Sequence, residues 1–332
     1  MTSEPEVSIV VCTRNRAGSL NGTLASLAQI RSERPWEALL VDNASTDDTA
    51  KVIDAADDCG GRLRHLYEAR PGLGAARDGA WRQAKGRLIC FTDDDCYLAP
   101  DYVDAISEAF RRRPHLGCLG GRILLFDPQD ARVTIDERDA PSEIAPYRFM
   151  PAGALQGANL SFRRETLERI GGFDPSLGAG TPFPCEDVDA VAATLWAGIP
   201  VGFDPGPVVF HHHGRRAADL EAVFEGYDRG RGAYYAKYLL RRDTRSAYFR
   251  AWMAIVAKYV EPAELAALRR EFRAARAYLE ANRRTDFLLL AAPVAFLAYA
   301  RARMRIAGLG VKQELRALIK GRGHDHGASD HG

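Results

Sequence analysis

Continuous apolar runs alternate with amphipathic segments along the first third of the chain. The runs VSIVVC, ALLV and LICFT are typical of strands covered on both faces. Between them lie segments that are expected to be helical. Strands are thus expected at residues 7–12, 38–41, 63–68 and 88–92, with helices at 20–27, 49–57 and 75–84. This alternation with short links predicts an α/β fold whose sheet is parallel and has right-handed crossovers.

The rest of the chain is predicted to hold further strands, a long polar stretch and a helical C-terminal region. Residues 127–152 show little periodicity, and long irregular stretches inside compact domains tend to be functional or mobile. Further helices are expected at residues 102–112, 165–170 and 186–196, and further strands at 117–126, 159–163 and 201–213. The predicted domains are residues 1–215, a basic helical region at 216–320 and a disordered tail at 321–332.

Charge is distributed unevenly along the chain of 332 residues. Residues 1–210 hold 22 Lys and Arg residues against 31 Asp and Glu residues, whereas residues 211–332 hold 23 against 13. An acidic first part suits a metal site, and a basic second part suits phosphates or an anionic membrane surface. Packing of two oppositely charged halves against each other explains the same asymmetry.

Compartment and membrane contact are predicted from three features. The six cysteines form no CxxC pair and lie among apolar neighbours, so they are expected to be reduced core residues of a cytoplasmic protein. The N-terminus has no basic region typical of a signal peptide. Residues 287–300 are apolar but too few to span a bilayer. Flanking arginines suit peripheral binding at the inner face of the plasma membrane, and a buried helix is the alternative.

Three consecutive carboxylates follow the predicted strand at residues 88–92. Asp93, Asp94 and Asp95 would repel one another at one sheet edge unless a positive group lies there, and a divalent cation carrying phosphates is the obvious candidate. Asp42 also follows a predicted strand. Ligands of open α/β sheets bind at the carboxyl ends of the strands, so these acids are expected to converge on one ligand. An acidic turn that caps the next helix is the alternative for the triplet.

The order of the motifs resembles the GT-A glycosyltransferases of family 2. The resemblance covers about residues 6–215 and rests on VSIVVCTRNR, VDNASTDDT, RPGLGAARDGA, TDDDCYLAPDYV, GANLSFRR, IGGFD and the Glu186-Asp187 pair. It implies a Rossmann-like mixed, mainly parallel sheet flanked by helices, here with a C-terminal helical appendage. It also implies transfer of a sugar from a nucleotide-diphosphate donor to an acceptor hydroxyl.

The resemblance implies which residues bind the donor nucleotide. The base and ribose are expected to contact Thr13, Arg14, Asn15, Arg16, Asp42 and Asn43. An aspartate can accept the imide N–H of a uracil-type base, although Asp42 could instead cap the following helix. Arg77 is expected at the base or the diphosphate, and Asp93 or Asp94 at the ribose.

The triplet matches the DXD signature of the family, whose last acid binds the metal. Asp95 is therefore expected to hold Mg²⁺ or Mn²⁺, which neutralises charge on the departing nucleotide diphosphate. His211 and His213, two residues apart on a predicted strand, could share a face toward this metal. The resemblance suggests one histidine there, and His211 is favoured. A solvated strand end and a separate zinc site are the alternatives for the histidines.

Glu186 and Asp187 match the family's ED motif, whose aspartate is the general base. Asp187 is expected to take the proton of the acceptor hydroxyl, with Glu186 and Asp189 orienting it or the acceptor. One base without an enzyme nucleophile implies inversion at the anomeric carbon. Helix capping is the alternative for these acids. Gly157 and Asn159 are expected on the acceptor side.

The acceptor is expected to be a sugar or a lipid-linked glycan. The basic, aromatic segment at residues 226–238 could hold a lipid diphosphate or lie at a headgroup surface, and a solvated amphipathic helix explains it too. Nucleic-acid binding is disfavoured because no recognised module accompanies the segment. The sequence thus predicts an inverting, metal-dependent transferase that uses a UDP-sugar to build a bacterial surface or secreted glycan. A nucleotidyltransferase and a non-catalytic nucleotide-sugar-binding protein are the alternatives; a nucleotidyltransferase would need a Gly-rich loop after the first strand.

Overall fold

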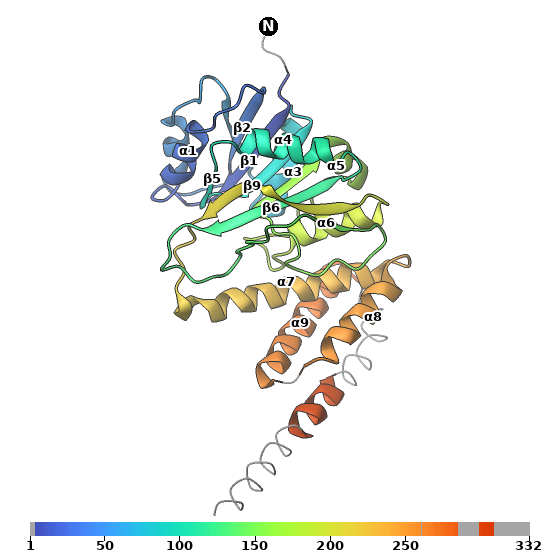
Figure 1. Cartoon of the computed structure of the whole chain (residues 1–332). Coiled ribbons are helices and arrows are strands. Elements are labelled where there is room, and N and C mark those ends of the chain that lie inside the picture. The colour runs from blue at the N-terminus through green and yellow to red at the C-terminus, as the bar shows by residue number, and fades with distance from the viewer. Residues whose placement is uncertain (1–3, 260, 285–298, 309–332) are drawn as a thin grey trace, which may run out of the picture. The chain divides into compact units, whose positions relative to one another are not determined.

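The computed structural model describes residues 4–259, 261–284 and 299–308. The chain divides into two compact units, with the division between Tyr234 and Tyr235. The first unit is an α/β structure and the second is helical, as Figure 1 shows by colour along the chain. The expected fold class is confirmed by these elements.

The first unit is built on one nine-stranded mixed sheet. Its strands are β1 (Val7–Thr13), β2 (Trp36–Asp42), β3 (Leu63–Tyr67), β4 (Leu88–Asp93), β5 (Cys96–Leu98), β6 (Cys118–Leu125), β7 (Ser142–Ile144), β8 (Asn159–Arg163) and β9 (Val201–His211). Their order is β3-β2-β1-β4-β8-β6-β9-β5, and β7 pairs with β9. The first four strands of this order run parallel, as predicted, whereas β8 lies antiparallel to both of its neighbours. The short strands β5 and β7 were not expected from the sequence.

Helices cover both faces of this sheet. The first unit contains α1 (Asn21–Ala28), α2 (Thr49–Asp54), α3 (Leu73–Gln83), α4 (Tyr102–Arg112), α5 (Arg164–Ile170), α6 (Glu186–Trp196) and the start of α7 (Leu220–Leu240). One core joins alternate side chains of β1 and β2 to residues of α2 and α4. On the other face, Phe91 packs against Phe162 and Phe173 and lies under the guanidinium of Arg77. The continuous apolar strands are therefore buried on both sides, as their composition predicts.

A buried carboxylate on β2 accepts hydrogen bonds from β1, from β3 and from the residues before β4. Glu37 of β2 is 4% exposed and accepts hydrogen bonds from Ser8 Oγ at 2.7 Å, Lys85 N at 2.5 Å and Arg64 Nη1 at 2.8 Å. Burial raises the pKa of Glu37, but these hydrogen bonds outweigh it and hold the pKa below its usual range. The ionised carboxylate thus stabilises the folded state.

Strand register brings the predicted acids to one edge of the sheet. Cys12 of β1 is opposite Asp93 of β4, and Thr13 is opposite Asp42 of β2. All three strands end here because polar turns follow their apolar runs. This carboxyl edge is the expected ligand-binding edge of such a sheet.

The second unit consists of helices packed through aromatic residues. It contains the end of α7, α8 (Arg245–Val256), α9 (Pro262–Ala281) and a helical stretch at residues 299–308. Trp252 packs edge-on against Phe272 and donates a hydrogen bond to buried Glu271 at 3.3 Å. No helix within residues 4–259, 261–284 and 299–308 is long and apolar enough to cross a membrane. Most of the apolar segment at 287–300 and the whole predicted tail lie outside the described residues.

Candidate active site

A cavity of about 600 Å³ opens at the carboxyl edge of the sheet and collects most of the predicted site residues. The predicted residues that line it are Thr13, Arg14, Arg16, Asn43, Arg77, Asp93, Asp94, Asp95, Gly157, Glu186, Asp187 and His211. Five predicted residues are not in its wall: Asn15, Asp42, Asn159, Asp189 and His213. Residues separated by more than a hundred positions in the sequence therefore share one cavity, which is lined from the first unit alone.

Arg77 of α3 connects three parts of this site. Its side chain is 2% exposed, and its Nη1 lies 3.1 Å from Glu186 Oε1 while its Nη2 lies 3.0 Å from Asp93 Oδ1. Nη2 also donates to the carbonyl oxygen of Gly157 at 3.1 Å. The planar guanidinium can satisfy these acceptors together because its donors point in fixed, diverging directions. Arg77 thus fixes the positions of two acids around the cavity.

Asp187 is held by backbone donors on both of its oxygens. Gly157 N donates to Oδ2 at 2.8 Å, and Val188 N donates to Oδ1 at 2.7 Å. A Cβ atom on Gly157 would lie 2.7 Å from Arg77 Nη1 and 3.0 Å from Asp187 Oδ2, so this contact requires glycine. The position at the start of α6 also favours a carboxylate, because the free N–H groups of a helix start attract negative charge. Asp187 is half-buried and fixed in direction.

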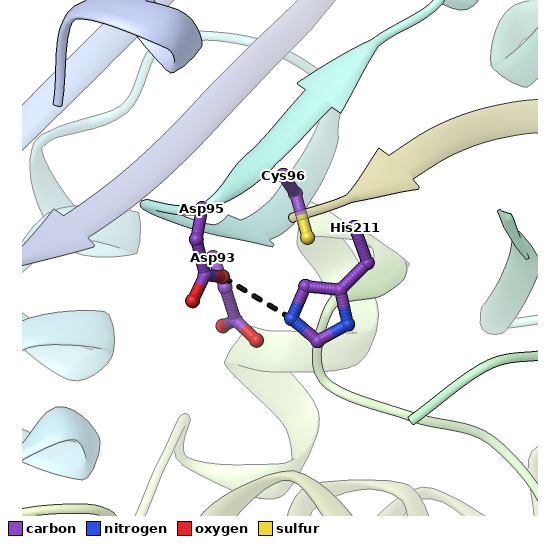
Figure 2. A group of neighbouring side chains, drawn as sticks. All are labelled: Asp93, Asp95, Cys96 and His211. Atoms are coloured by element: carbon purple, nitrogen blue, oxygen red, sulfur yellow. Dashed lines mark ion pairs between the residues drawn. The ribbon is translucent and has the colours of Figure 1, made fainter. Parts of the chain in front are cut away.

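Four side chains form a potential metal site, shown in Figure 2. Asp93, Asp95, Cys96 and His211, called the four-donor set below, each offer one ligand atom within 4.8 Å of the others. His211 Nε2 lies 3.2 Å from Asp95 Oδ1. Burial lowers the pKa of His211, but the hydrogen bond and the charge of Asp95 outweigh it and raise the pKa above its usual value. Burial raises the pKa of Asp95, but the hydrogen bond and the charge of His211 outweigh it and hold the pKa of Asp95 below its usual range.

His211 is oriented by a residue of the irregular stretch. Its Nδ1 lies 3.3 Å from the carbonyl oxygen of Thr134, which can only accept a hydrogen bond. Nδ1 therefore carries a proton, and Nε2 donates to Asp95 when the ring is protonated. A metal that displaces the Nε2 proton would meet the lone pair of this nitrogen. A carbonyl behind a ligating imidazole is a common way of fixing its tautomer.

His213 does not line the cavity, although its ring packs edge-on against that of His211 at 4.9 Å. The strand β9 ends at His211, so the alternation of side chains along a strand no longer applies two residues later. Arg215 N donates to His213 Nδ1 at 2.9 Å, and His213 Nε2 lies 2.9 Å from the carbonyl oxygen of Ala131. Both ring nitrogens are thus used by the backbone. His213 is not among the donors grouped with His211, and its expected role at the metal stays a prediction.

Two carboxyls of the cavity, Asp94 and Glu186, have raised pKa values because they are buried. Asp94 accepts a hydrogen bond from Thr13 Oγ1 at 2.6 Å and lies 3.5 Å from Arg16 Nε. Burial nevertheless raises the pKa of Asp94 to about 6. It raises the pKa of Glu186 to about 7, despite Arg77 beside it. Burial disfavours the charged form of a carboxyl, and a cation bound nearby would offset this effect.

The predicted residues outside the cavity wall have structural contacts. Asp42 Oδ1 accepts Ser45 N at 2.9 Å and so shapes the turn after β2. Asn159 is 1% exposed and its amide is bonded to the hydroxyl of Tyr102 and to two backbone carbonyls. Asn15 lies on the surface and accepts Thr46 N at 2.7 Å. These contacts support the neighbouring turns.

Part of the cavity wall was not predicted. Thr134 adopts a φ of 55°, which is unusual for a β-branched residue, and its hydroxyl lies 2.7 Å from the hydroxyl of Tyr227 on α7. Gln156, Arg215 and Arg231 also line the cavity. The basic, aromatic composition of residues 226–238 was the only sequence signal for the α7 side. No signal in the sequence marked Thr134.

Comparison with known proteins shows which family and which proteins this chain resembles. Residues 8–171 match the family model described as glycosyl transferase family 2. Over 167 residues the chain is 33% identical to validoxylamine A glucosyltransferase of Streptomyces hygroscopicus subsp. jinggangensis, covering 47% of this chain and 38% of that protein. Over 186 residues it is 25% identical to glucosyl-dolichyl phosphate glucuronosyltransferase of Haloferax volcanii, covering 52% and 57%.

A similar solved structure is the mannosyltransferase PcManGT from Pyrobaculum calidifontis in complex with GDP-Man and Mn²⁺. It has a TM-score of 0.54 and 21% identity, over 92% of this chain and 85% of that chain. TarS 1–349 of S. aureus in complex with UDP-GlcNAc gives a TM-score of 0.56 at 16% identity, over 91% and 89%. Both likenesses concern the fold. The chain spans between 14% and 57% of the length of eight curated relatives that it matches.

Proposed function

Because this chain belongs to glycosyl transferase family 2 and has the GT-A fold, we propose that it is an inverting, metal-dependent transferase. The donor is a nucleotide-diphosphate sugar, with UDP-sugars as the first candidates. The family match favours this function over a nucleotidyltransferase or a non-catalytic sugar-nucleotide-binding protein. The observation that carries the proposal is the cavity in which Arg77 connects Asp93 to Glu186, next to Asp187.

A divalent ion fits the chemistry of the donor set. Carboxylate oxygens and an imidazole nitrogen suit Mn²⁺, and oxygen ligands suit Mg²⁺. Asp95 and His211 would hold the ion, with Asp93 beside them. When bound, such an ion supplies Lewis-acid stabilisation of the departing nucleotide diphosphate. Its positive charge would offset part of the burial cost of the carboxyls around it, among them Asp94 and Glu186, whose pKa values burial raises.

Asp187 acts as the general base in the proposed reaction. It takes the proton from the acceptor hydroxyl as the oxygen attacks the anomeric carbon from the face opposite the leaving group. The two backbone N–H groups that it accepts keep the carboxylate directed into the cavity. Arg77 and Glu186 position the base and the metal side chains relative to each other. One displacement step without an enzyme nucleophile inverts the configuration.

The acceptor enters between the irregular stretch and α7. This side of the cavity is lined by Leu155, Val188, Val223 and Tyr227, with Arg215 nearby and Arg231 in an ion pair with Asp228. Such a wall suits a sugar or a lipid-linked glycan, in the synthesis of a surface or secreted polysaccharide. The basic helical region from residue 216 onward is proposed to bring the enzyme to an anionic membrane surface on the cytoplasmic side.

A thermal-shift screen of nucleotide diphosphates and their sugars, with and without Mn²⁺, tests the donor and the metal together. A ligand that binds the folded state stabilises it by RT ln(1 + [L]/Kd), which is about 2.7 kcal/mol at a hundredfold excess over Kd. We expect the diphosphate and the diphospho-sugars of one nucleotide base to stabilise the protein, and only when Mn²⁺ is present. An absence of any metal-dependent response would contradict the proposal.

Two substitutions separate binding from chemistry. Asp187→Asn should retain metal-dependent donor binding and lower turnover by about 10²- to 10⁴-fold, the usual contribution of a general base. Asp95→Ala should abolish metal-dependent donor binding. Donor affinity is measured by calorimetry and turnover by release of the nucleotide diphosphate. An Asp187→Asn enzyme with normal turnover would overturn the base assignment.

A further inference from the structure

The fourth member of the four-donor set, Cys96, has no part in the proposed reaction. Mn²⁺ and Mg²⁺ prefer oxygen and nitrogen ligands and gain little from a thiol. Yet Cys96 is fully buried directly opposite His211 in the register of β5 and β9. Figure 2 shows its sulfur beside the ring of His211, on the side of the two carboxylates. A sulfur, an imidazole and two carboxylates together form the ligand set of a softer ion.

We propose that this site also binds Zn²⁺ or a similar thiophilic ion through all four side chains, and that this ion shuts the site to the donor diphosphate. The blocking role rests on the proposed function, whereas the binding itself does not.

Coordination number explains why the two classes of ion have different consequences. Zn²⁺ prefers four ligands in a tetrahedron, with sulfur at about 2.3 Å and nitrogen or oxygen at about 2.0–2.2 Å. Ligand atoms that lie within 4.8 Å of one another need only small side-chain movements to meet one such ion. Four protein ligands then leave no open position, as in structural zinc sites. Mn²⁺ and Mg²⁺ take about six ligands, so positions stay open for phosphate oxygens.

The surroundings favour a doubly charged ion among these side chains. The two carboxylates and a metal-bound thiolate carry three negative charges, and a coordinating thiol loses its proton to the metal. Arg77 at Asp93 and Arg16 at Asp95 offset part of this charge. Thr134 keeps the Nδ1 proton of His211 in place, so Nε2 is the nitrogen whose proton a metal would displace. Zinc binding therefore requires no rearrangement of the strands.

Cobalt titration of the full-length protein without sugar donor tests the inference. Co²⁺ replaces Zn²⁺ in such sites and gives an intense sulfur-to-metal charge-transfer band in the near ultraviolet when a thiolate binds it. We expect the band in the wild type and in Cys12→Ser, and its loss in Cys96→Ser. Cys12 is the matched control because it lines the same cavity but is not in the four-donor set. A wild type without the band, or a Cys96→Ser variant that keeps it, overturns the proposal.

A second measurement needs no variant and covers the case in which Cys96→Ser does not fold. X-ray absorption at the zinc edge of the wild type should show one sulfur at about 2.3 Å. A shell of oxygen and nitrogen alone refutes the inference. Histidines 324, 326 and 331 of the C-terminal tail can also bind zinc, but the tail has no cysteine and cannot contribute a sulfur.

Metal affinities and sugar-transfer rates of the wild type and Cys96→Ser then test whether Cys96 makes the site prefer Zn²⁺. Cys96→Ser should weaken Zn²⁺ binding by at least about tenfold, the least that loss of a supporting ligand contact usually costs, and should leave Mn²⁺ affinity within about twofold. Zn²⁺ should compete with Mn²⁺ in sugar transfer by the wild type and compete less in the variant. If Cys96→Ser lost affinity for Zn²⁺ and Mn²⁺ equally, Cys96 would have no role in selecting between the two ions. If no sugar is transferred but the sulfur signal is present, the proposed function fails and the zinc site stands.

Discussion

Replacing Arg77 by methionine removes the cation that joins α3, α6 and β4 around the cavity. The side chain of Arg77 is 2% exposed, and that of Glu186 is 6% exposed, so solvent cannot replace the lost ion pair at Glu186. The carbonyl of Gly157 also loses a donor, whereas the side chain of Asp93 is 32% exposed and keeps contact with water. The burial of Glu186 therefore dominates the expected loss.

The magnitude follows from the cost of an uncompensated buried charge. Breaking a buried ion pair from one side usually costs about 3–5 kcal/mol. Arg77→Lys keeps a charge but not the diverging donors, so it should lose at least one charge-assisted hydrogen bond, about 1.5–3 kcal/mol. For a unit of this size the methionine variant corresponds to a fall in the melting temperature of roughly 6–20 °C. The expected order of stability is wild type, lysine, methionine.

The effect should depend on pH in a defined direction. Burial already raises the pKa of Glu186 to about 7 with Arg77 present, and removing this neighbouring cation raises it further. A carboxyl whose folded pKa lies above its unfolded value of about 4.3 takes up a proton on folding, so stability falls as pH rises until the folded pKa is passed. The wild type loses this contribution up to about pH 7. The methionine variant keeps losing stability at higher pH.

Urea denaturation from about pH 6 to about pH 9 measures this difference. Fluorescence of Trp81, which is buried on the same helix as Arg77, contributes to the signal. The double variant Arg77→Met with Glu186→Gln should be at least about 1 kcal/mol more stable than Arg77→Met at high pH, because no charge is left buried. The reasoning is refuted if Arg77→Met costs under about 1 kcal/mol, or if its cost does not grow with pH.

Two further predictions concern the scaffold. The depressed pKa of Glu37 gives stability that is present above its unfolded pKa of about 4.3 and is lost as pH falls through the folded pKa. Glu37→Gln should therefore make the unfolding free energy, measured by urea denaturation, less dependent on pH in the acid range. At neutral pH the substitution should cost about 1–3 kcal/mol. The same measurement on exposed Glu33→Gln gives the background, and an unchanged pH dependence in the acid range would count against the network. A Cβ on Gly230 of α7 would collide with the backbone carbonyl of Pro184, so Gly230→Ala should cost about 1–3 kcal/mol and slow sugar transfer. Gly226→Ala in the same helix meets only an arginine tip and should gain up to about 1 kcal/mol, and equal melting temperatures for the two variants would sink this explanation.

The sheet could be predicted from the sequence because its signals are local. The strands β1, β2 and β4 are continuous apolar runs, and such runs are stable only when both faces are covered. Parallel pairing then places their carboxyl ends together, so the acid at the end of β4 could be expected next to the turn after β1. The strands β5 and β7 were missed because each has three residues, too few to show a period.

The sequence by itself determined the ligand-binding edge and the residue types that gather there, since chain direction and strand ends follow from local composition. Only the tertiary structure decided which of these side chains face the cavity. His211 and His213 differ because β9 ends between them and backbone groups from the loop at residues 131–134 bond to each ring in a different way. Cys96 joins the metal donors through its register opposite His211. Such choices depend on partners far away in the sequence, whose distances no local pattern encodes.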